Sequence, residues 1–470
     1  MMRRYRMLEG KTRIELTNPQ NNETEVFEEV NMITNAVPDI FKYNPSGLLY
    51  STLGIGARFD EEIFPIANKC FGGVLLFHDQ LEEHSQKYYA PSNNEIIGYA
   101  SNNVNNTDNS KRGSLNLTES KELHNGYKFV WDFTTSQGNG LISSIALTHY
   151  RGGRVFYGNE TNKENAFICL KKVSMELDVP STNYYGHVVE ARLLNNELIS
   201  IVPNTDHSID LIRFKEPLLN LGLLDNATSF TPQDIQKHSI QTQGFFFDGI
   251  SVHKASFFDG KDGFWYGFIY KVDTKVNMTY INRIKINKND FSFEINNWEL
   301  KEVQLQDIAY AASTNGGYLA KTISACLVGN YLYTIGRNYS TVYKLNINNP
   351  VDVVKIELGF RSNFSRGSDV HLRFIPWGDY ILANDFILTR EDKVIKTASE
   401  NIQFITNHPI EIGPYRLGYS VQNFTSKTVC YKTLLLHTPY LATINNLSKP
   451  ITKTADKTMK ITYTLTEKEV

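Results

Sequence analysis

The feature that most constrains the fold is a short pattern that recurs along the middle of the chain. Each copy has an apolar strand, a tight turn rich in Gly, Asn or Asp, and a second strand led by aromatic residues. Four copies and a partial fifth occupy residues 187–214, 254–286, 324–347, 369–397 and 418–436. Their spacing, roughly 40–50 residues and longer in places, is typical of β-propeller blades.

Packing requirements favour the same architecture. A single small sheet cannot bury both of its faces, whereas sheets packed radially around an axis bury most of them. We therefore expect a β-propeller-like domain of about five blades, although the sequence contains no WD or kelch signature. Two sheets packed face to face in a β-sandwich are the competing architecture.

The length of the chain and the scarcity of helix signals predict a mostly β protein with several domains. At 470 residues the chain exceeds the size of a single hydrophobic core. Helix signals are few, and one covers residues 231–238, with Thr231 as N-cap and Pro232 at the first helical position. We expect an N-terminal arm or attachment segment (1–50), an N-terminal β-domain (51–150), the β-propeller-like domain (151–440) and a C-terminal β-strand module (441–470).

Within the expected N-terminal β-domain, residues 125–149 predict a β-hairpin. Four aromatic side chains alternate onto one face of its first strand: Tyr127, Phe129, Trp131 and Phe133. On the second strand Leu141, Ser143, Ile145 and Leu147 alternate onto one face. Between the two strands, residues 136–140 read Ser-Gln-Gly-Asn-Gly, a turn sequence that tolerates positive φ angles.

A second, unusually regular strand lies at the end of the sequence, within residues 448–470. Four side chains alternate on one of its faces: Met459, Ile461, Tyr463 and Leu465. Such a strand either pairs with the sheet edge of another subunit or closes a β-domain of its own chain. Together with the four aromatic residues of the hairpin, these are our candidates for core packing or for a joint between subunits.

Charge and cysteine content argue against several function classes. The chain has 48 Lys and Arg residues against 50 Asp and Glu residues. The resulting net charge of -2 provides no long-range electrostatic attraction to nucleic acid. We therefore expect no nucleic-acid binding. No apolar run approaches the length of a membrane span, so we also expect no membrane insertion. The four cysteines have no CxxC or Cys/His spacing, which predicts neither a zinc site nor a disulfide framework. We expect no metal ion and no cofactor.

No sequence motif indicates catalysis. The segment HDQLEEH (78–84) carries metal-binding residue types, but its two His are six apart rather than four, so it reads as a strand end entering a loop. GIGARF (54–59) lacks the third glycine of a phosphate-binding loop, and DGKDG (259–263) reads as a hairpin turn. We expect no catalytic residues and no enzyme activity, although the paired carboxylates of a glycosidase leave no local signature.

Three segments near the start of the chain resemble a string of motifs in structural proteins of tailed bacteriophages and prophages of low-GC Gram-positive bacteria. They are GGVLLFHDQLEEH (72–84), YYAPSNNEIIGYAS (88–101) and NGYKFVWDFTTSQGNGLISSIALTH (125–149). The segment LATINNLSKPITKTADKTMKITYTLTE (441–467) is similar to a terminal segment that recurs in such proteins. The middle of the chain, residues 151–430, matches them only in its general pattern of short strands separated by turns.

The resemblance implies a structural virion protein, namely a tail, baseplate or fibre subunit that is assembled in the host cytoplasm through protein–protein contacts. It implies other virion proteins as partners and a homo-oligomeric state. Trimeric fibres usually carry a heptad stem, and residues 1–50 contain no sustained heptads, which favours a compact adaptor or tail-tip subunit.

Two other functions stay open at this point. Five-bladed propellers also occur in receptor-binding proteins of Gram-positive phages, so the alternative is a receptor-binding protein that recognises host cell-surface polysaccharide through its propeller loops. The remote alternative is an enzyme that degrades cell-wall or other polysaccharide.

Overall fold

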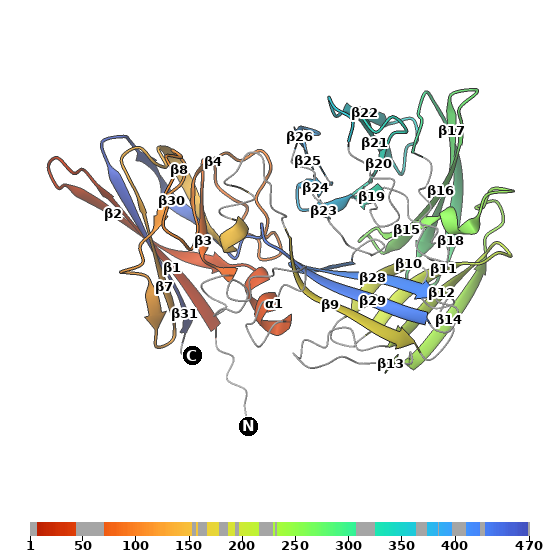
Figure 1. Cartoon of the computed structure of the whole chain (residues 1–470), viewed down its shortest axis with the longest axis horizontal. Coiled ribbons are helices and arrows are strands. Elements are labelled where there is room, and N and C mark those ends of the chain that lie inside the picture. Colours follow the sequence, from red (N-terminus) through yellow and green to blue (C-terminus); the bar gives the residue numbers. More distant parts are fainter. Residues whose placement is uncertain are drawn as a thin grey trace. The chain divides into compact units, whose positions relative to one another are not determined.

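The chain folds into two compact units. The computed structural model describes residues 7–43, 70–152, 157, 167–177, 187–192, 197–215, 229–230, 233–306, 325–362, 374–383, 385–396, 410–423 and 428–468. The sheet unit consists of residues 1–170, 413–415 and 436–470, and the propeller unit of residues 171–412 and 416–435. Strands dominate both units, as expected (Figure 1), and α1 (Ala36–Tyr43) is a short helix of the sheet unit.

Ten strands of the sheet unit are joined in one hydrogen-bonded sheet. They are β1 (Met7–Thr17), β2 (Thr24–Ile33), β3 (Gly73–Phe77), β4 (Ile96–Ala100), β5 (Ser114–Leu115), β6 (Lys121–Leu123), β7 (Gly126–Phe133), β8 (Gly140–Thr148), β30 (Thr443–Lys453) and β31 (Thr458–Lys468). Their order in the sheet is β4-β3-β8-β30-β2-β1-β31-β7-β5, and β6 also pairs with β7.

The sheet has two halves that meet at a very short ladder. β2 pairs with β1 over residues 24–31, but with β30 only at Met32 and Ile33. β30 then shifts register between Asn446 and Ile451 and continues along β8. One half is therefore β4-β3-β8-β30, and the other is β2-β1-β31-β7-β5.

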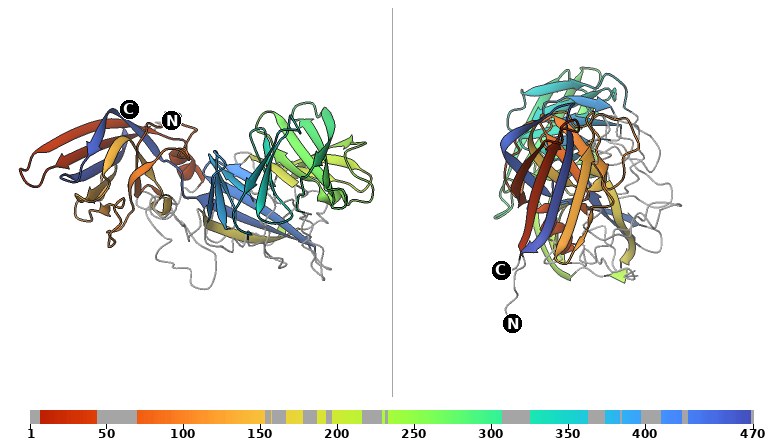
Figure 2. Two further views of the ribbon diagram at one scale, coloured as in Figure 1. Left: turned by 90° about the horizontal axis from the view of Figure 1, so that it is seen from above. Right: turned by 90° about the vertical axis from the view of Figure 1, so that its left-hand side faces the viewer.

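The first and last strands of the chain lie side by side in the second half (Figure 2). β1 pairs antiparallel with β31 along its whole length, from Met7 opposite Lys468 to Thr17 opposite Thr458. Residues 1–50 and 441–470, which we expected as an arm and as a separate strand module, thus supply strands to the same sheet. Of the two roles considered for the last strand, the pairing shows the one that closes a β-domain of its own chain.

The hairpin predicted over residues 125–149 has the expected strands but the wrong pairing. β7 and β8 start and end near the predicted limits, and Gly138 in the connecting turn has a φ of +62°. However, β7 pairs with β31, β5 and β6, whereas β8 pairs with β3 and β30. Alternation in a sequence fixes which face of a strand is buried, but it does not fix which strand lies beside it.

The propeller unit has the five blades that the repeat predicts. Blade 1 is β10 (His187–Arg192), β11 (Glu197–Pro203), β12 (Ser208–Lys215) and β14 (Gln233–Gln241). Blade 2 is β15 (Ser256–Asp259), β16 (Phe264–Asp273), β17 (Met278–Asn287) and β18 (Phe293–Lys301). Blade 3 is β19 (Ala325–Val328), β20 (Tyr331–Ile335), β21 (Thr341–Asn346) and β22 (Val353–Glu357). Blade 4 is β23 (Ile375–Trp377), β24 (Tyr380–Leu382), β25 (Phe386–Thr389) and β26 (Val394–Lys396).

Blade 5 closes the ring with strands from both ends of the propeller sequence. It contains β27 (Ile410–Ile412), β28 (Tyr415–Asn423) and β29 (Thr428–His437), followed by β9 (Phe167–Leu177) and the short β13 (Ser229–Phe230). Backbone hydrogen bonds between β9 and β29 therefore join the strand before blade 1 to the last blade. The innermost strands contact one another around the axis: β10 contacts β15 and β27, β15 contacts β19, and β19 contacts β23.

Apolar side chains fill the spaces between blades. One core joins Ile201 and Leu211 of blade 1 to Ile269 and Ile284 of blade 2. Two similar cores lie between blades 2 and 3 and between blades 3 and 4. Burial between neighbouring blades is the radial packing that the repeat pattern predicts.

Two further expectations fall on this part of the chain. The helix predicted over residues 231–238 is wrong, because residues 233–241 form β14, the outer strand of blade 1. Only Ile240 of that strand is buried, so the segment has almost no apolar periodicity, and pairing with β12 decides its conformation. The hairpin turn predicted for DGKDG (259–263) is confirmed, because this segment joins β15 to β16 and has positive φ angles at Lys261 and Gly263. GIGARF (54–59), in the sequence of the sheet unit, lies outside the described residues.

Candidate functional site

The eight candidate residues from the two ends of the sequence lie opposite one another in the sheet. β7 and β31 are adjacent and antiparallel, so each aromatic residue of β7 has one partner on β31. The pairs are Phe133 with Met459, Trp131 with Ile461, Phe129 with Tyr463, and Tyr127 with Leu465. The structure thus brings together two sets of residues that the sequence pattern identifies separately.

This paired face belongs to the core of the sheet unit. Tyr127 is half-buried, and the other seven side chains are buried. Trp131 is fully buried, and its indole N–H donates a 3.0 Å hydrogen bond to the Ser101 carbonyl. Its ring stacks on Phe129 with centroids 5.5 Å apart. The residues act by packing within one chain, and as placed they offer no surface to a second subunit.

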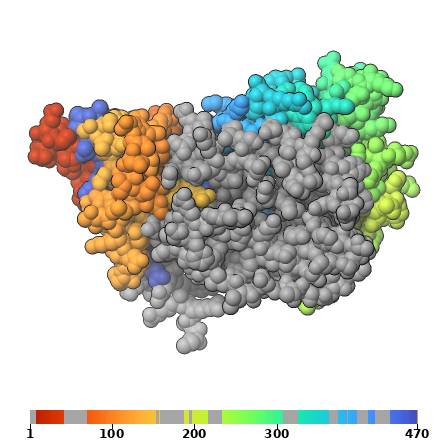
Figure 3. Space-filling model, viewed as in Figure 1, coloured from red at the N-terminus to blue at the C-terminus, as the bar shows by residue number. Residues whose placement is uncertain are grey.

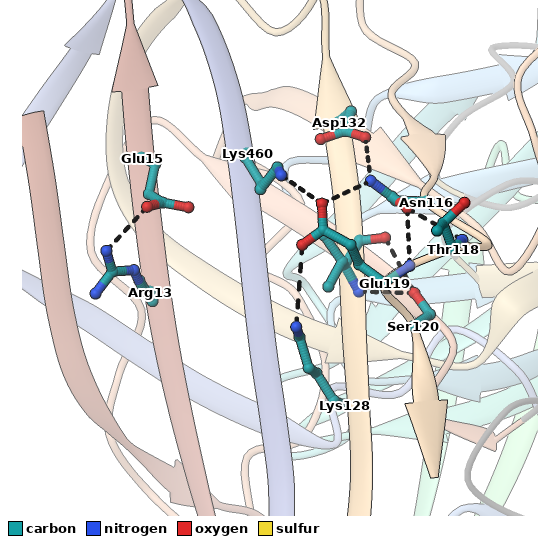
Figure 4. Close-up of polar contacts among 10 residues, drawn as sticks. Arg13, Glu15, Asn116, Thr118, Glu119, Ser120, Lys128, Asp132 and Lys460 are labelled. Atoms are coloured by element: carbon teal, nitrogen blue, oxygen red, sulfur yellow. Dashed lines mark hydrogen bonds and ion pairs between the residues drawn. The ribbon is translucent and has the colours of Figure 1, made fainter. Parts of the chain in front are cut away.

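The opposite face of the same strands carries a polar network that the sequence did not reveal (Figure 4). Glu119, in the loop before β6, accepts a hydrogen bond from Lys460 of β31 and lies 3.9 Å from Lys128 of β7. Asn116 donates to Glu119 at 3.2 Å and to Asp132 at 2.9 Å. The hydrogen bond from Lys460 lowers the pKa of the Glu119 carboxyl. These contacts fasten the 116–120 loop to two strands of the sheet.

A second ion-pair group continues the same face onto β1 and β2. Arg13 contacts Glu15 at 2.9 Å and also donates to Glu28, the residue opposite it on β2. Two exposed valines flank Glu28, since Val26 is 44% exposed and Val30 is 67% exposed. This face therefore consists of paired charges and uncovered apolar side chains, and it lies outside the core.

In the propeller unit, charged side chains gather at one end of the innermost strands. Lys288 contacts Glu190 of β10 at 3.0 Å and Asp259 of β15 at 2.6 Å. Burial opposes its charge, but the hydrogen bonds to Asp259 and Glu190 outweigh burial and raise the pKa of Lys288. Lys261 reaches from the β15–β16 turn to Glu411 of β27. In both places an ammonium group occupies the space beside the carboxylates.

The HDQLEEH segment shows no shared site. His78 Nδ1 lies 2.8 Å from Asp79, Glu82 pairs with Lys87, and Glu83 accepts a hydrogen bond from Asn446. Among the residues that the structure describes, no three His, Cys, Asp or Glu side chains form a group able to hold a metal ion. Over the same residues, no helix has the length and apolarity needed to cross a membrane.

Comparisons with known proteins give no family. No family model matches the chain, and no curated protein matches it. One solved structure with a weak similarity to this chain is AztD from Citrobacter koseri. The match has 8% sequence identity and a TM-score of 0.24, and it covers 84% of this chain and 96% of AztD. A nidogen/laminin complex has 11% identity over 71% of this chain and 95% of its own, with a TM-score of 0.23. Similarities this weak carry no argument about function.

Proposed function

We propose that this protein is a structural subunit of a tailed bacteriophage particle, in the tail, baseplate or fibre, and that it acts through protein–protein assembly rather than catalysis. Its partners in this proposal are other virion proteins and further copies of itself.

The observation that carries the proposal is the folding together of all four segments that resemble phage structural proteins. Residues 72–84, 88–101 and 125–149 supply β3, β4, β7 and β8, and residues 441–467 supply β30 and most of β31. Residues 150–440 separate the third segment from the fourth. The fourth nevertheless pairs with the third along β7–β31 and β8–β30. The resemblance thus describes one folded unit rather than scattered matches.

The connectivity of the chain fits an assembly role. The sheet unit contains both the first and the last described strands, and the propeller is inserted between β8 and β30. Insertion between two strands of one sheet leaves the inserted part free to vary in sequence while the fold that holds it is kept.

Immunogold electron microscopy of intact particles tests this proposal. Antibody raised against the whole protein should label particles produced by the strain that carries the gene, at the tail, baseplate or fibres. Particles from a strain in which the gene is deleted are the control, and they should lose both the label and normal tail assembly. Absence of label from all particles of the parent strain would refute the proposal.

Recognition of host surface glycans by the propeller is a second candidate. It is favoured by the charged end of the innermost strands, where the Lys261 side chain is 65% exposed and spans from blade 2 to Glu411 of blade 5. A glycan array with the purified protein should then show binding that Lys261→Ala weakens, while Lys355→Ala, in an exposed ion pair of blade 3, should leave it unchanged. A purely structural subunit should bind no glycan.

A further inference from the structure

β2 has an open edge along most of its length. β1 covers one side of residues 24–31, while on the other side β30 contributes only the ladder at Met32 and Ile33. Pairing of β30 with β2 ends at Ile444, before β30 shifts its register along β8 between Asn446 and Ile451. In that stretch Pro450 has no backbone N–H to offer a neighbour. Ser448 reaches β2 only through hydrogen bonds to the Glu29 side chain and not through the backbone of the edge. Figure 3 shows the β1–β2 hairpin, in red, at the surface of the sheet unit.

The backbone direction identifies the residues that present this edge. Thr34 N–H donates to the Ala442 carbonyl, so even-numbered residues of this segment point their backbone groups away from β1. Val26, Glu28 and Val30 therefore direct both N–H and C=O outward. Within the described residues, none of the three has a backbone partner on that side.

The side chains of these three residues do not protect the edge in the usual way. Natural edge strands are commonly blocked by charged side chains, especially lysine, by proline, by a bulge or by an inward-pointing charge. Here the positions carry two exposed β-branched side chains, Val26 and Val30, which suit a paired strand. The one charge between them, Glu28, is already paired with Arg13 of the same chain.

We propose that β2 pairs antiparallel with β2 of a second copy of this chain, about a two-fold axis at Glu28. The outward residues read Val-Glu-Val in either direction, so they are self-complementary. In this register Val26 faces the partner's Val30, Glu28 faces the partner's Glu28, and about six backbone hydrogen bonds form. Each Glu28 keeps its own Arg13, so the row across the joint is Arg-Glu-Glu-Arg, with no net charge.

Two alternatives are less favourable. A shift of the register by two residues separates the two Glu28 carboxylates, which Arg13 already neutralises, but it places each Val26 opposite a carboxylate and loses both contacts between valines. A strand of a different protein would need its own complementary pattern, whereas the second copy carries one already. Pairing about a two-fold axis also uses up both edges, so the assembly stops at two chains and does not grow into a fibre.

Sedimentation of the full-length protein tests the joint. The wild type should be a dimer, whereas Val26→Lys/Val30→Lys and Glu28→Pro should be monomers. Proline at position 28 removes an N–H that β1 does not use, so the sheet unit should stay folded by circular dichroism. Leu117→Lys is a matched control, because Leu117 is also 67% exposed and lies on a loop away from β2, and it should remain a dimer.

Disulfide trapping tests the register. Paired residues of this kind have Cα atoms about 5.5 Å apart, within disulfide range. Under mild oxidation Glu28→Cys should therefore link to itself across the axis. Val26→Cys alone should not link, because its two copies would lie about 14 Å apart along the strands, whereas Val26→Cys/Val30→Cys should. A monomeric wild type, or a dimer that survives both lysines and gives no link at position 28, would overturn the proposal.

Discussion

Lys344 Nζ lies 2.9 Å from Asp392 Oδ2, and this ion pair joins blade 3 to blade 4. Lys344 is on β21, the third strand of its blade, and Asp392 is in the turn between β25 and β26 of the next blade. The ammonium group also lies over the rings of Tyr331 and Tyr333, at 4.8 and 5.6 Å from their centroids. One cation thus combines an ion pair across the blade boundary with cation–π contacts inside its own blade.

Similar contacts occur at three other blade boundaries. Arg283 of β17 lies over Trp298 and donates a 2.5 Å hydrogen bond to the Ile347 carbonyl of blade 3. Arg416 of β28 lies over Trp377 and donates to the Pro376 carbonyl of blade 4 at 2.7 Å. Lys288, which links blades 2 and 1, lies over Trp265. These cations supply directional contacts that apolar packing lacks, in addition to the backbone bridge between Leu305, which follows the last strand of blade 2, and Gly336 of blade 3.

We expect Lys344→Ala to destabilise the propeller by about 1–3 kcal/mol, because it removes a half-buried ion pair and the contact with two tyrosines. Denaturant unfolding of Lys344→Ala, Asp392→Ala and the double variant would measure the coupling between the two side chains. Lys355→Ala is the matched control, since its ion pair with Glu357 is in the same blade but exposed, and it should not shift the unfolding midpoint. A coupling energy of zero would mean that the ion pair does not hold the blades together.

Trp131→Ala should destabilise the sheet unit by about 3–5 kcal/mol, since the side chain is fully buried. The substitution leaves a cavity opposite Ile461 and removes the partner of the Ser101 carbonyl. In differential scanning calorimetry the transition of the sheet unit should move to lower temperature, and Leu117→Ala should leave it in place. Normal melting of Trp131→Ala would contradict the role of this residue as a core anchor.

The sequence predicts the propeller well because each blade is local. The strands of a blade follow one another in sequence with short turns, as in residues 325–357. A repeated strand–turn–strand pattern in the sequence is therefore enough to predict the architecture. The closing strand β9 escaped prediction because it is far in sequence from β29, its neighbour in blade 5. Similarly, alternation identified Trp131 and Ile461 as members of buried faces, but no local signal showed that these two residues pair.

The polar face of the sheet was beyond prediction for a related reason. Glu119 lies in a loop, and its partners Lys128 and Lys460 are on different strands that become neighbours only after β31 inserts beside β7. The open edge of β2 could not be seen either, because it results from the short ladder between β2 and β30. Edges and ion pairs are properties of strand order, which single-sequence periodicity does not contain.

Gly10 is needed because Tyr463 approaches its backbone closely. A Cβ at position 10 would collide with the Tyr463 hydroxyl and lie 3.3 Å from the Asn31 Cβ. Gly10→Ala should therefore destabilise the sheet unit by about 1–3 kcal/mol. Tyr463→Phe removes the colliding oxygen, so Gly10→Ala/Tyr463→Phe should be more stable than Gly10→Ala in chemical denaturation. Additive losses in the double variant would show that the collision is not the cause.

Lys453 should make the stability of the sheet unit depend on pH in the alkaline range. The side chain is buried, and its ammonium group donates to the Thr134 carbonyl at 2.9 Å and to the Asn139 side chain at 2.6 Å. Burial lowers the pKa of Lys453 to about 8, while nearby Asp456 opposes the shift. In the unfolded chain the pKa of a lysine is about 10.4.

The sign of this effect follows from proton binding. Below pH 8 both states hold the proton, so Lys453 adds no pH dependence. Between about pH 8 and 10.4 the unfolded state binds the proton more fully, so the free energy of unfolding rises with pH, by at most about 1.4 kcal/mol per unit. Lys453→Met removes the titrating group while keeping an unbranched chain. The wild type should therefore gain stability relative to Lys453→Met between pH 8 and 10 in urea unfolding, and a constant difference between them would show that Lys453 keeps an ordinary pKa in the folded protein.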